Sequence, residues 1–340
     1  MNIVITGGAG FLGVKLARTL LKLPGLCLSG QPAAAISRIT LVDRVKPPPD
    51  LIGDSRIRVV VGDLNQLLAQ SGAENQAVRA QDSLIFHLAA AVSGECESDF
   101  DLGMRSNLDA TSALLAHCRA LGSVPMVVFA SSLAVFGNSP EQPLPPVIDD
   151  RTLPTPQSSY GIQKFIGEQL VADYGRKGYI RARNVRLMTV SVRPGKPNGA
   201  ASSFLSGMIR EPLAGVRATC PVAPDTPVAL SSPGRTIAGL LRAAEASDEA
   251  WGARTAINLP ALATTPREMA DALGRVAGSE VAGLIDWLPD PAISRLVTSW
   301  PAIVDAKRAR ALGLLPDADF GSIVAEYLSE NPRPATNKGE

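Results

Sequence analysis

The glycine-rich segment at residues 6–13 most constrains what this chain can fold into. It reads TGGAGFLG and follows directly on the apolar run at residues 2–5. A short apolar run predicts a buried parallel strand, and the glycines then turn the chain into a helix whose free N–H groups face phosphates. Gly7 permits the tight turn, Gly10 lets the backbone approach a pyrophosphate, and Gly13 lets the helix pack closely on the strand. The helix should begin near Phe11, and the residues predicted to bind a dinucleotide here are Gly7, Gly10, Phe11, Leu12 and Gly13.

Composition narrows the class of protein. Hydrophobic residues make up 46% and charged residues 19% of the 340 positions, and the formal net charge is +1, so we expect an ordinary globular protein. Without a basic run, a nucleic-acid partner is not expected. No apolar stretch is long enough to span a bilayer, so no membrane association is expected. The chain enters a strand at once, which leaves no room for a signal peptide and predicts a cytoplasmic location.

Cysteine and histidine usage argues against disulfides and against a metal centre. The four cysteines are scattered without C-x-x-C spacing, which is typical of reduced thiols. Only two histidines are present, and His87 is interpreted as a satisfied core residue. We therefore expect no metal. The residues concerned are Cys27, Cys96, Cys118, Cys220, His87 and His117.

The first half of the chain alternates β-rich runs with helical stretches. This alternation predicts an α/β fold with a doubly wound parallel sheet, the Rossmann arrangement. The residues around 24–35 form a loop insertion in this reading. Strands are expected at 2–5, 38–42, 56–61, 83–90, 125–132 and 182–189, with helices at 110–119 and 159–174.

Beyond about residue 190 proline and glycine become dense. That composition predicts loops and short helices that form a smaller C-terminal lobe covering the substrate. Two later helices are expected at 265–274 and 320–328, the first capped by Thr265. The predicted organisation is a dinucleotide-binding domain with the catalytic residues at 1–190, a mainly substrate-binding lobe at 191–330 with some chain returning to the sheet, and a frayed tail at 331–340.

Acidic residues at strand ends suggest how an adenosine would be held. Asp43 ends the second strand, where its carboxylate can accept hydrogen bonds from a ribose and repel a 2′-phosphate, so NAD is favoured over NADP. Arg44 next to it could instead take a 2′-phosphate, which keeps NADP open. Asp63 and Leu64 follow the third strand and could hold the adenine. Residues at the end of the fourth strand let the backbone pass the cofactor, at Leu88, Ala89 and Ala90.

Tyr160 and Lys164 stand four residues apart on a predicted helix, so both side chains leave one face. Free tyrosine has a pKa near 10. The Lys164 ammonium and a cationic nicotinamide ring would lower that pKa until Tyr160 becomes a general base near neutral pH. Ser132, at the end of the fifth strand, can hold the reacting hydroxyl against Tyr160. The pattern gains weight because a dinucleotide fingerprint precedes it.

Taken together, these motifs resemble the extended short-chain dehydrogenase/reductase superfamily of the NAD-dependent epimerase/dehydratase type. The resemblance covers roughly residues 1–190 and includes TGGAGFLG at 6–13, HLAA at 87–90, SSLAVFG at 131–137 and YGIQK at 160–164. It implies that Ser132, Tyr160 and Lys164 are the catalytic trio. It further implies that Asn107 supports the active site, that Lys164 also holds the nicotinamide ribose, and that the protein is a homodimer.

Departures from the common pattern indicate the reaction. Leu133 and Ala134 occupy the position where sugar-nucleotide dehydratases carry acidic residues, so dehydration is disfavoured. The stretches SYGIQK, SVRPGKPNGAASSF and MIREPLAG resemble a narrower group, the D-erythronate dehydrogenases. The implied reaction is NAD-dependent oxidation of the 2-hydroxyl of a small sugar acid, D-erythronate, to 2-dehydro-D-erythronate. A nucleotide-sugar epimerase with bound NAD and a non-catalytic dinucleotide-binding protein remain the alternatives.

Basic and hydroxyl residues beyond the sixth strand are candidates for substrate contacts. Any of four basic side chains could clamp a carboxylate, and Arg193 or Lys196 is preferred. Thr189 and Ser132 are further candidates, and serines could bond the substrate hydroxyls. The full sets are Arg193, Lys196, Arg210 and Arg235 for the carboxylate and Ser202, Ser203, Ser231 and Ser232 for hydroxyls.

Overall fold

A computed structural model describes residues 1–70, 77–195 and 200–332 of the chain. Its centre is a seven-stranded sheet in which every neighbouring pair is parallel, in the order β11-β7-β5-β4-β1-β2-β3. The predicted doubly wound α/β fold is therefore confirmed. The strands are β1 (Asn2–Thr6), β2 (Arg38–Asp43), β3 (Ile57–Val61), β4 (Asp82–His87), β5 (Met126–Ser132), β7 (Arg181–Leu187) and β11 (Ile257–Asn258).

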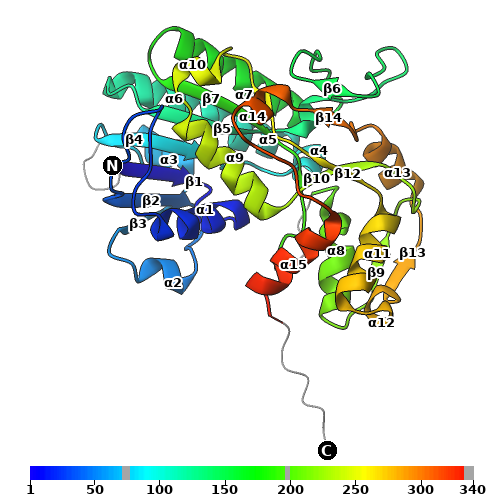
Figure 1. The fold of residues 1–340 in the computed structure, drawn as a ribbon. Helices are drawn as coiled ribbons and strands as arrows, with labels where there is room; N and C mark the ends of the chain where they lie inside the picture. Colours follow the sequence, from blue (N-terminus) through cyan, green and yellow to red (C-terminus); the bar gives the residue numbers. More distant parts are fainter. Residues whose placement is uncertain (71–76, 196–199, 333–340) are drawn as a thin grey trace, which may run out of the picture.

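Helices cover both faces of this sheet (Figure 1). Successive residues of β1 point to opposite faces of the sheet, and both faces are apolar. Ile3 and Ile5 pack in the core under α1 and α9, whereas Val4 packs in the core under α3, α6 and α7. These helices are α1 (Phe11–Lys22), α2 (Pro49–Ile52), α3 (Leu64–Ala69), α4 (Ser93–Ser98), α5 (Phe100–Gly103), α6 (Ala110–Leu121), α7 (Ser159–Arg176), α9 (Pro233–Glu245) and α10 (Asp248–Trp251). A π-helical turn, η1 (Met104–Asp109), leads into α6, and a 3-10 turn, η2 (Leu133–Val135), follows β5.

A smaller lobe, built from the later chain, has its own apolar core and lies beside the sheet (Figure 1). Its helices are α8 (Ser203–Leu213), α11 (Pro266–Ala277), α12 (Ser279–Ala282), α13 (Pro291–Thr298) and α15 (Phe320–Glu330). Thr265 caps α11 in a capping box with Glu268. The short strands β8 (Thr189–Val190), β10 (Val228–Ser231) and β12 (Leu262–Thr264) form one sheet, and β9 (Ala218–Cys220) pairs with β13 (Ile285–Trp287).

Residues distant in sequence tie the two parts together. After the lobe begins, the chain returns to the large sheet as α9 and as the edge strand β11. Later, β14 (Val304–Asp305) pairs with β6 (Ile148–Asp149), and α14 (Lys307–Ala311) follows it. Glu326 of the last helix accepts hydrogen bonds from Lys15 Nζ of α1 and from the Gly234 N–H of α9, at 2.9 and 2.8 Å. The C-terminal helix is thus attached to the first helix of the sheet domain.

Candidate active site

The turn between β1 and α1 leaves room only for glycine. Gly7 has φ +71°, and a Cβ there would lie 2.8 Å from the backbone nitrogen of Ala89. At Gly13 a Cβ would lie 2.1 Å from the carbonyl oxygen of Gly7. At Gly10 a Cβ would meet only that same oxygen, at 3.2 Å, among the atoms of the described residues, so this position is otherwise open. The backbone at the start of α1 can therefore be approached closely by a ligand.

No side chain caps the N-terminus of α1, which begins at Phe11 as predicted. The backbone N–H groups of its first turn, including that of Leu12, point away from the helix end, where they can bind an anion. The open Gly10 position and the uncapped helix end together fit a dinucleotide pyrophosphate. The chain can therefore hold NAD at this turn.

Two clefts meet at this turn. The catalytic cleft has a volume of about 310 Å³ and the adenosine cleft about 350 Å³. Gly7, Gly10, Leu88 and Ala90 line both, so the clefts are continuous. The catalytic cleft also contains Phe11, Leu12, Gly13, Ser132, Tyr160, Lys164, Thr189 and Arg193, and the adenosine cleft contains Asp43, Asp63, Leu64 and Ala89.

Asp43 lies at the end of β2, beside the glycine turn. Its Oδ2 accepts a hydrogen bond of 2.9 Å from the Ala9 N–H, and its Oδ1 accepts one of 3.3 Å from the Val45 N–H. This fixes the carboxylate at the wall of the adenosine cleft, where a ribose would lie. Arg44, the residue that could bind a 2′-phosphate, instead contacts Asp63 at 3.5 Å. Asp63 also caps α3 through the N–H groups of Asn65 and Gln66.

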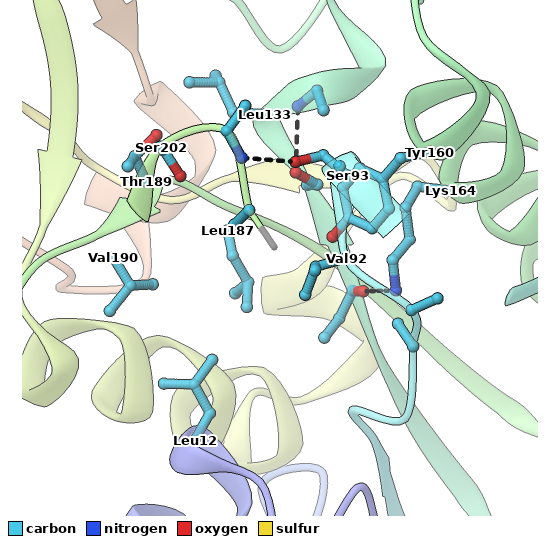
Figure 2. Close-up of a pocket in the computed structure, with 18 of the residues that line it drawn as sticks. Leu12, Val92, Ser93, Leu133, Tyr160, Lys164, Leu187, Thr189, Val190 and Ser202 are labelled. Carbon is cyan, nitrogen blue, oxygen red and sulfur yellow. Dashed lines mark hydrogen bonds between the residues drawn. The ribbon is translucent and has the colours of Figure 1, made fainter. Parts of the chain in front are cut away.

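The catalytic helix α7 begins against the end of β5. Ser158 caps it by accepting from the Gly161 N–H, and a Cβ on Gly161 would lie only 2.1 Å from the Ala134 oxygen. This close approach places Tyr160 near Ser132. One turn further on, Lys164 Nζ donates a 2.9 Å hydrogen bond to the Ala130 oxygen of β5. The sequence predicted that these three side chains converge, and all three line one cleft. Figure 2 shows Tyr160 and Lys164 next to each other on one side of it.

The charges around Tyr160 differ from the sequence expectation. Burial raises the pKa of Tyr160, while a hydrogen bond with Ser132 and the positive charge of Arg193 oppose that rise. Lys164 was expected to have the largest effect on the pKa of Tyr160. Its Nζ instead donates to the Ala130 oxygen and lies 5.7 Å from the centre of the Tyr160 ring. Burial lowers the pKa of Lys164 to about 8. Within the described part of the chain, Arg193 is thus the cation that favours the Tyr160 phenolate.

Asn107 supports the cleft from beneath and lines neither cleft. Its side chain is 3% exposed; Oδ1 accepts from the Ala91 N–H at 2.8 Å, and Nδ2 donates to Gln163 Oε1 at 2.8 Å. The π-helical turn η1 carries it, and such turns often occur at functional sites. Asn107 therefore fixes the segment that follows β4. His87 bridges Thr6 and Thr111, and burial lowers its pKa to about 3, so it stays neutral.

The substrate end of the catalytic cleft is lined by hydroxyl groups and one arginine. Thr189 and Ser202 lie across the cavity from Tyr160 and Lys164 (Figure 2). Arg193 is half-buried; its Nε donates to the Val190 oxygen at 3.1 Å, and among residues 1–70, 77–195 and 200–332 no carboxylate pairs with it. Lys196 falls outside the described residues.

Other proposed substrate contacts lie elsewhere. Arg210 pairs with Glu211 inside the lobe, and Arg235 is exposed on α9 near Asp317. Ser231 and Ser232 are buried in the lobe, and Ser232 caps α9. Ser203 begins α8 and does not line the cleft. None of these five residues lines the catalytic cleft. Arg210 and Ser232 instead make contacts within the lobe and at the start of α9.

Sequence reasoning also missed part of the cleft wall. Ser93 at the start of α4 lines the cleft, and its hydroxyl accepts a 3.3 Å hydrogen bond from the Ala201 N–H. Leu296 and Trp300, from α13 and the residues after it, complete the wall. The Asn138 N–H donates to the Ser299 oxygen at 3.0 Å, which holds this segment beside the catalytic strand. No local pattern marks such residues, although Ser93 follows closely on the predicted fourth strand.

The fold and the site define an oxidoreductase of the extended short-chain dehydrogenase/reductase class. A dinucleotide turn, a Tyr160–Lys164 pair and Ser132 share one cleft at the carboxyl ends of parallel strands. The chain belongs to the NAD dependent epimerase/dehydratase family, whose model matches residues 3–226. It is an NAD-dependent enzyme.

Individual relatives are similar along the whole chain. A D-erythronate dehydrogenase of Cupriavidus necator is 51% identical over 97% of this chain and 98% of its own length. A D-erythronate dehydrogenase of Haemophilus influenzae is 39% identical over 96% of this chain and 99% of its own. A crystal structure described as a nucleoside-diphosphate-sugar epimerase from Agrobacterium tumefaciens has a TM-score of 0.85 and 38% identity, and covers 97% of this chain and 94% of its own. In the part of the chain that is described, no helix is long and apolar enough to cross a membrane.

Proposed function

We propose that this enzyme oxidises the 2-hydroxyl of D-erythronate with NAD and releases 2-dehydro-D-erythronate. The two D-erythronate dehydrogenases that match nearly the whole chain support this substrate. The single observation on the site that carries the proposal is Arg193, a half-buried guanidinium that lines the catalytic cleft beside Tyr160. A buried cation without an acidic partner is unfavourable unless a ligand supplies the charge, and a carboxylate fits its planar fork.

Each residue of the cleft has its own role in this proposed reaction. Arg193 holds the substrate carboxylate, and Ser132 accepts or donates a hydrogen bond at the C2 hydroxyl. Tyr160, as the phenolate, takes the proton of that hydroxyl while the C2–H bond breaks and the C2=O bond forms. Lys164 keeps a positive charge near the phenolate and holds the nicotinamide ribose. When bound, NAD supplies the acceptor for the hydride that leaves C2.

The geometry of the two clefts supports an assignment of the cofactor contacts. We assign the pyrophosphate to Gly7, Gly10 and the N-terminus of α1, and the adenosine ribose to Asp43. Asp63 and Leu64 would contact the adenine, and Leu88, Ala89 and Ala90 would form the floor beneath the cofactor. On this assignment residues 1–190 form mainly the NAD-binding unit and residues 191–330 mainly the substrate-binding lobe.

The size of the catalytic cleft also supports a small acid. Its volume of about 310 Å³ has to accept the nicotinamide end of the cofactor as well as the substrate. That value is at the lower end for ligand pockets, which span roughly 300–1,000 Å³. Leu296 and Trp300 limit the space, and Ser93, Thr189 and Ser202 offer hydroxyl groups to the rest of a short polyol chain.

A nucleotide-sugar epimerase is the second candidate, favoured by the similarity to the Agrobacterium tumefaciens structure. The test is a screen of aldonic acids with NAD and with NADP, followed at the absorbance band of the reduced nicotinamide. We expect net NADH on addition of D-erythronate. An epimerase would return the hydride to its substrate and give no net absorbance change, which would refute the proposed reaction.

We further propose a cytoplasmic homodimer. Its support is an apolar strip on the outer side of the catalytic helix, where Ile162 and Ile166 are 46% and 38% exposed. Phe100 on the neighbouring α5 is 61% exposed. Three apolar side chains on adjacent helices suit burial against a second copy. Sedimentation of the purified protein, with Ile166→Glu as the disruptive variant, tests the dimer. A monomeric wild type would contradict it.

A further inference from the structure

A buried ion pair lies directly behind the catalytic residues. Glu168 of α7 is 2% exposed and Arg186 of β7 is 5% exposed. Arg186 Nε and Nη2 each donate a 2.8 Å hydrogen bond, one to each carboxylate oxygen of Glu168. The guanidinium also lies over the ring of Phe136 at 4.9 Å. Two parallel hydrogen bonds of this kind fix the orientation of the guanidinium relative to the carboxylate as well as the distance between them.

The same carboxylate holds the strand that carries the catalytic serine. Ser131 Oγ donates a 2.5 Å hydrogen bond to Glu168 Oε1, and Ser132 is the next residue. On β7, Arg186 is the register partner of Ser131, so one acid joins α7 to two adjacent strands at their carboxyl ends. Tyr160, Lys164 and Glu168 follow each other at intervals of four, which places them on one face of α7.

We propose that Glu168 is a positioning residue of the active site: it fixes α7 against the ends of β5 and β7, and it places a negative charge one helical turn from Lys164. This inference rests on the proposed dehydrogenase function only for its kinetic readout.

The charge matters because three titratable groups near Lys164 favour their uncharged forms. On β4, His87 has a pKa of about 3. On α4, burial raises the pKa of the Cys96 thiol. On α7 itself, burial raises the pKa of Tyr160. Burial lowers the pKa of Lys164 to about 8, and Cys96 and Glu168 oppose that decrease. Of these two groups Glu168 is the carboxylate, and Arg186 on β7 is the cation paired with it.

The test separates charge from simple structural support. Removing Glu168 alone would leave Arg186 buried and unpaired, so we use the double variant Glu168→Gln with Arg186→Met, because replacing both members of a buried pair is often tolerated. The new amide can still accept from Ser131, and the methionine can still pack on Phe136. The matched control is Asp173→Asn, which removes an exposed carboxylate from the same helix.

Two readouts are measured, on variants whose circular dichroism spectrum matches that of wild type. The first is the titration of Lys164 in the cofactor-free protein, followed by NMR of ¹³Cε-labelled lysine and assigned with Lys164→Arg. The second is the alkaline limb of the kcat/KM profile for D-erythronate. We expect both midpoints to fall by about half a pH unit or more in the double variant, and the control to match wild type. Unchanged midpoints in a folded double variant would overturn the proposal.

A second variant keeps the inference testable if the double variant does not fold. Ser131→Ala removes one hydrogen bond and keeps every charge, so kcat should fall several-fold while the Lys164 titration stays unchanged. An unchanged kcat would overturn the positioning role. If wild type makes no NADH from D-erythronate, the proposed function fails, and the kinetic readouts move to whichever substrate the aldonic-acid screen identifies. The NMR titration still decides the inference about Glu168.

Discussion

Replacing Arg193 by methionine tests how the enzyme selects an acid. The substitution keeps the length and apolar stem of the side chain and removes the guanidinium that lines the cleft beside Tyr160. The Nε bond to the Val190 oxygen is lost as well, but it is a single contact. A half-buried, charge-assisted pair with the substrate carboxylate should contribute about 2–4 kcal/mol. Its loss predicts a decrease of roughly 30- to 1,000-fold in kcat/KM for D-erythronate.

The same substitution should change the pH profile in a defined direction. Arg193 favours the charged form of Tyr160, so its removal raises the pKa of the phenol. Because proton removal from the substrate needs the phenolate, the acid limb of kcat/KM should move to higher pH. Arg193→Lys keeps the charge without the planar fork and should recover part of both effects.

The assay follows NADH formation from D-erythronate and from erythritol, which has the hydroxyls but no carboxylate. Arg235→Met is the control, since Arg235 is an exposed arginine on α9 outside the cleft. The loss should be much larger for the acid, because erythritol oxidation is affected only by the higher pKa of Tyr160. The reasoning is refuted if Arg193→Met stays within about two-fold of wild type on D-erythronate. It is equally refuted if erythritol oxidation falls by the same factor.

Four further outcomes are expected. Tyr160→Phe should lower kcat by roughly 10²–10⁴-fold while NAD still quenches tryptophan fluorescence, and a variant that keeps more than a tenth of the rate would remove Tyr160 from the role of base. Gly13→Ala should abolish NAD binding in calorimetry, because its Cβ would lie 2.1 Å from the Gly7 oxygen; unchanged binding would contradict the assigned pyrophosphate site. Lys164 has a pKa of about 8 and loses its charge above it, so kcat/KM should decline above pH 8 in a pH-rate series, and a profile flat to pH 10 would argue against this role. Trp300→Ala should raise kcat/KM for five-carbon aldonates relative to D-erythronate about ten-fold, and no change in that ratio would show that the residue does not limit chain length.

Features set by local chemistry could be predicted from the sequence. The turn at Gly7 needs a positive φ, and the tyrosine–lysine spacing fixes a shared helix face before any tertiary contact forms. The strand ends at Asp43 and Asp63 were also visible, since acidic residues follow apolar runs there. The predicted strands and helices accordingly lie within a few residues of the observed ones. Asn107 was placed near the site, but its π-helical turn was not foreseen.

Features set by contacts between distant segments could not be predicted. The segment with Trp300 reaches the cleft because the Ser299 oxygen accepts a hydrogen bond from the Asn138 N–H. No sequence pattern predicts that contact. Arg210 and Arg193 both look like free cations in the sequence, yet one finds a carboxylate neighbour and the other does not, within the part of the chain that is described. The charge that favours the Tyr160 phenolate was assigned to Lys164, because helix spacing shows which side chains share a face but not which hydrogen bonds they make.

The bond between Lys15 and Glu326 has a consequence for how the enzyme is made. It joins residues 311 positions apart, and it supports α1, the helix to whose first turn we assign the pyrophosphate. During synthesis Lys15 of α1 leaves the ribosome 311 residues before Glu326 does. The nascent sheet domain therefore lacks this contact until α15 has been made, and its affinity for the dinucleotide should increase once α15 docks on α1.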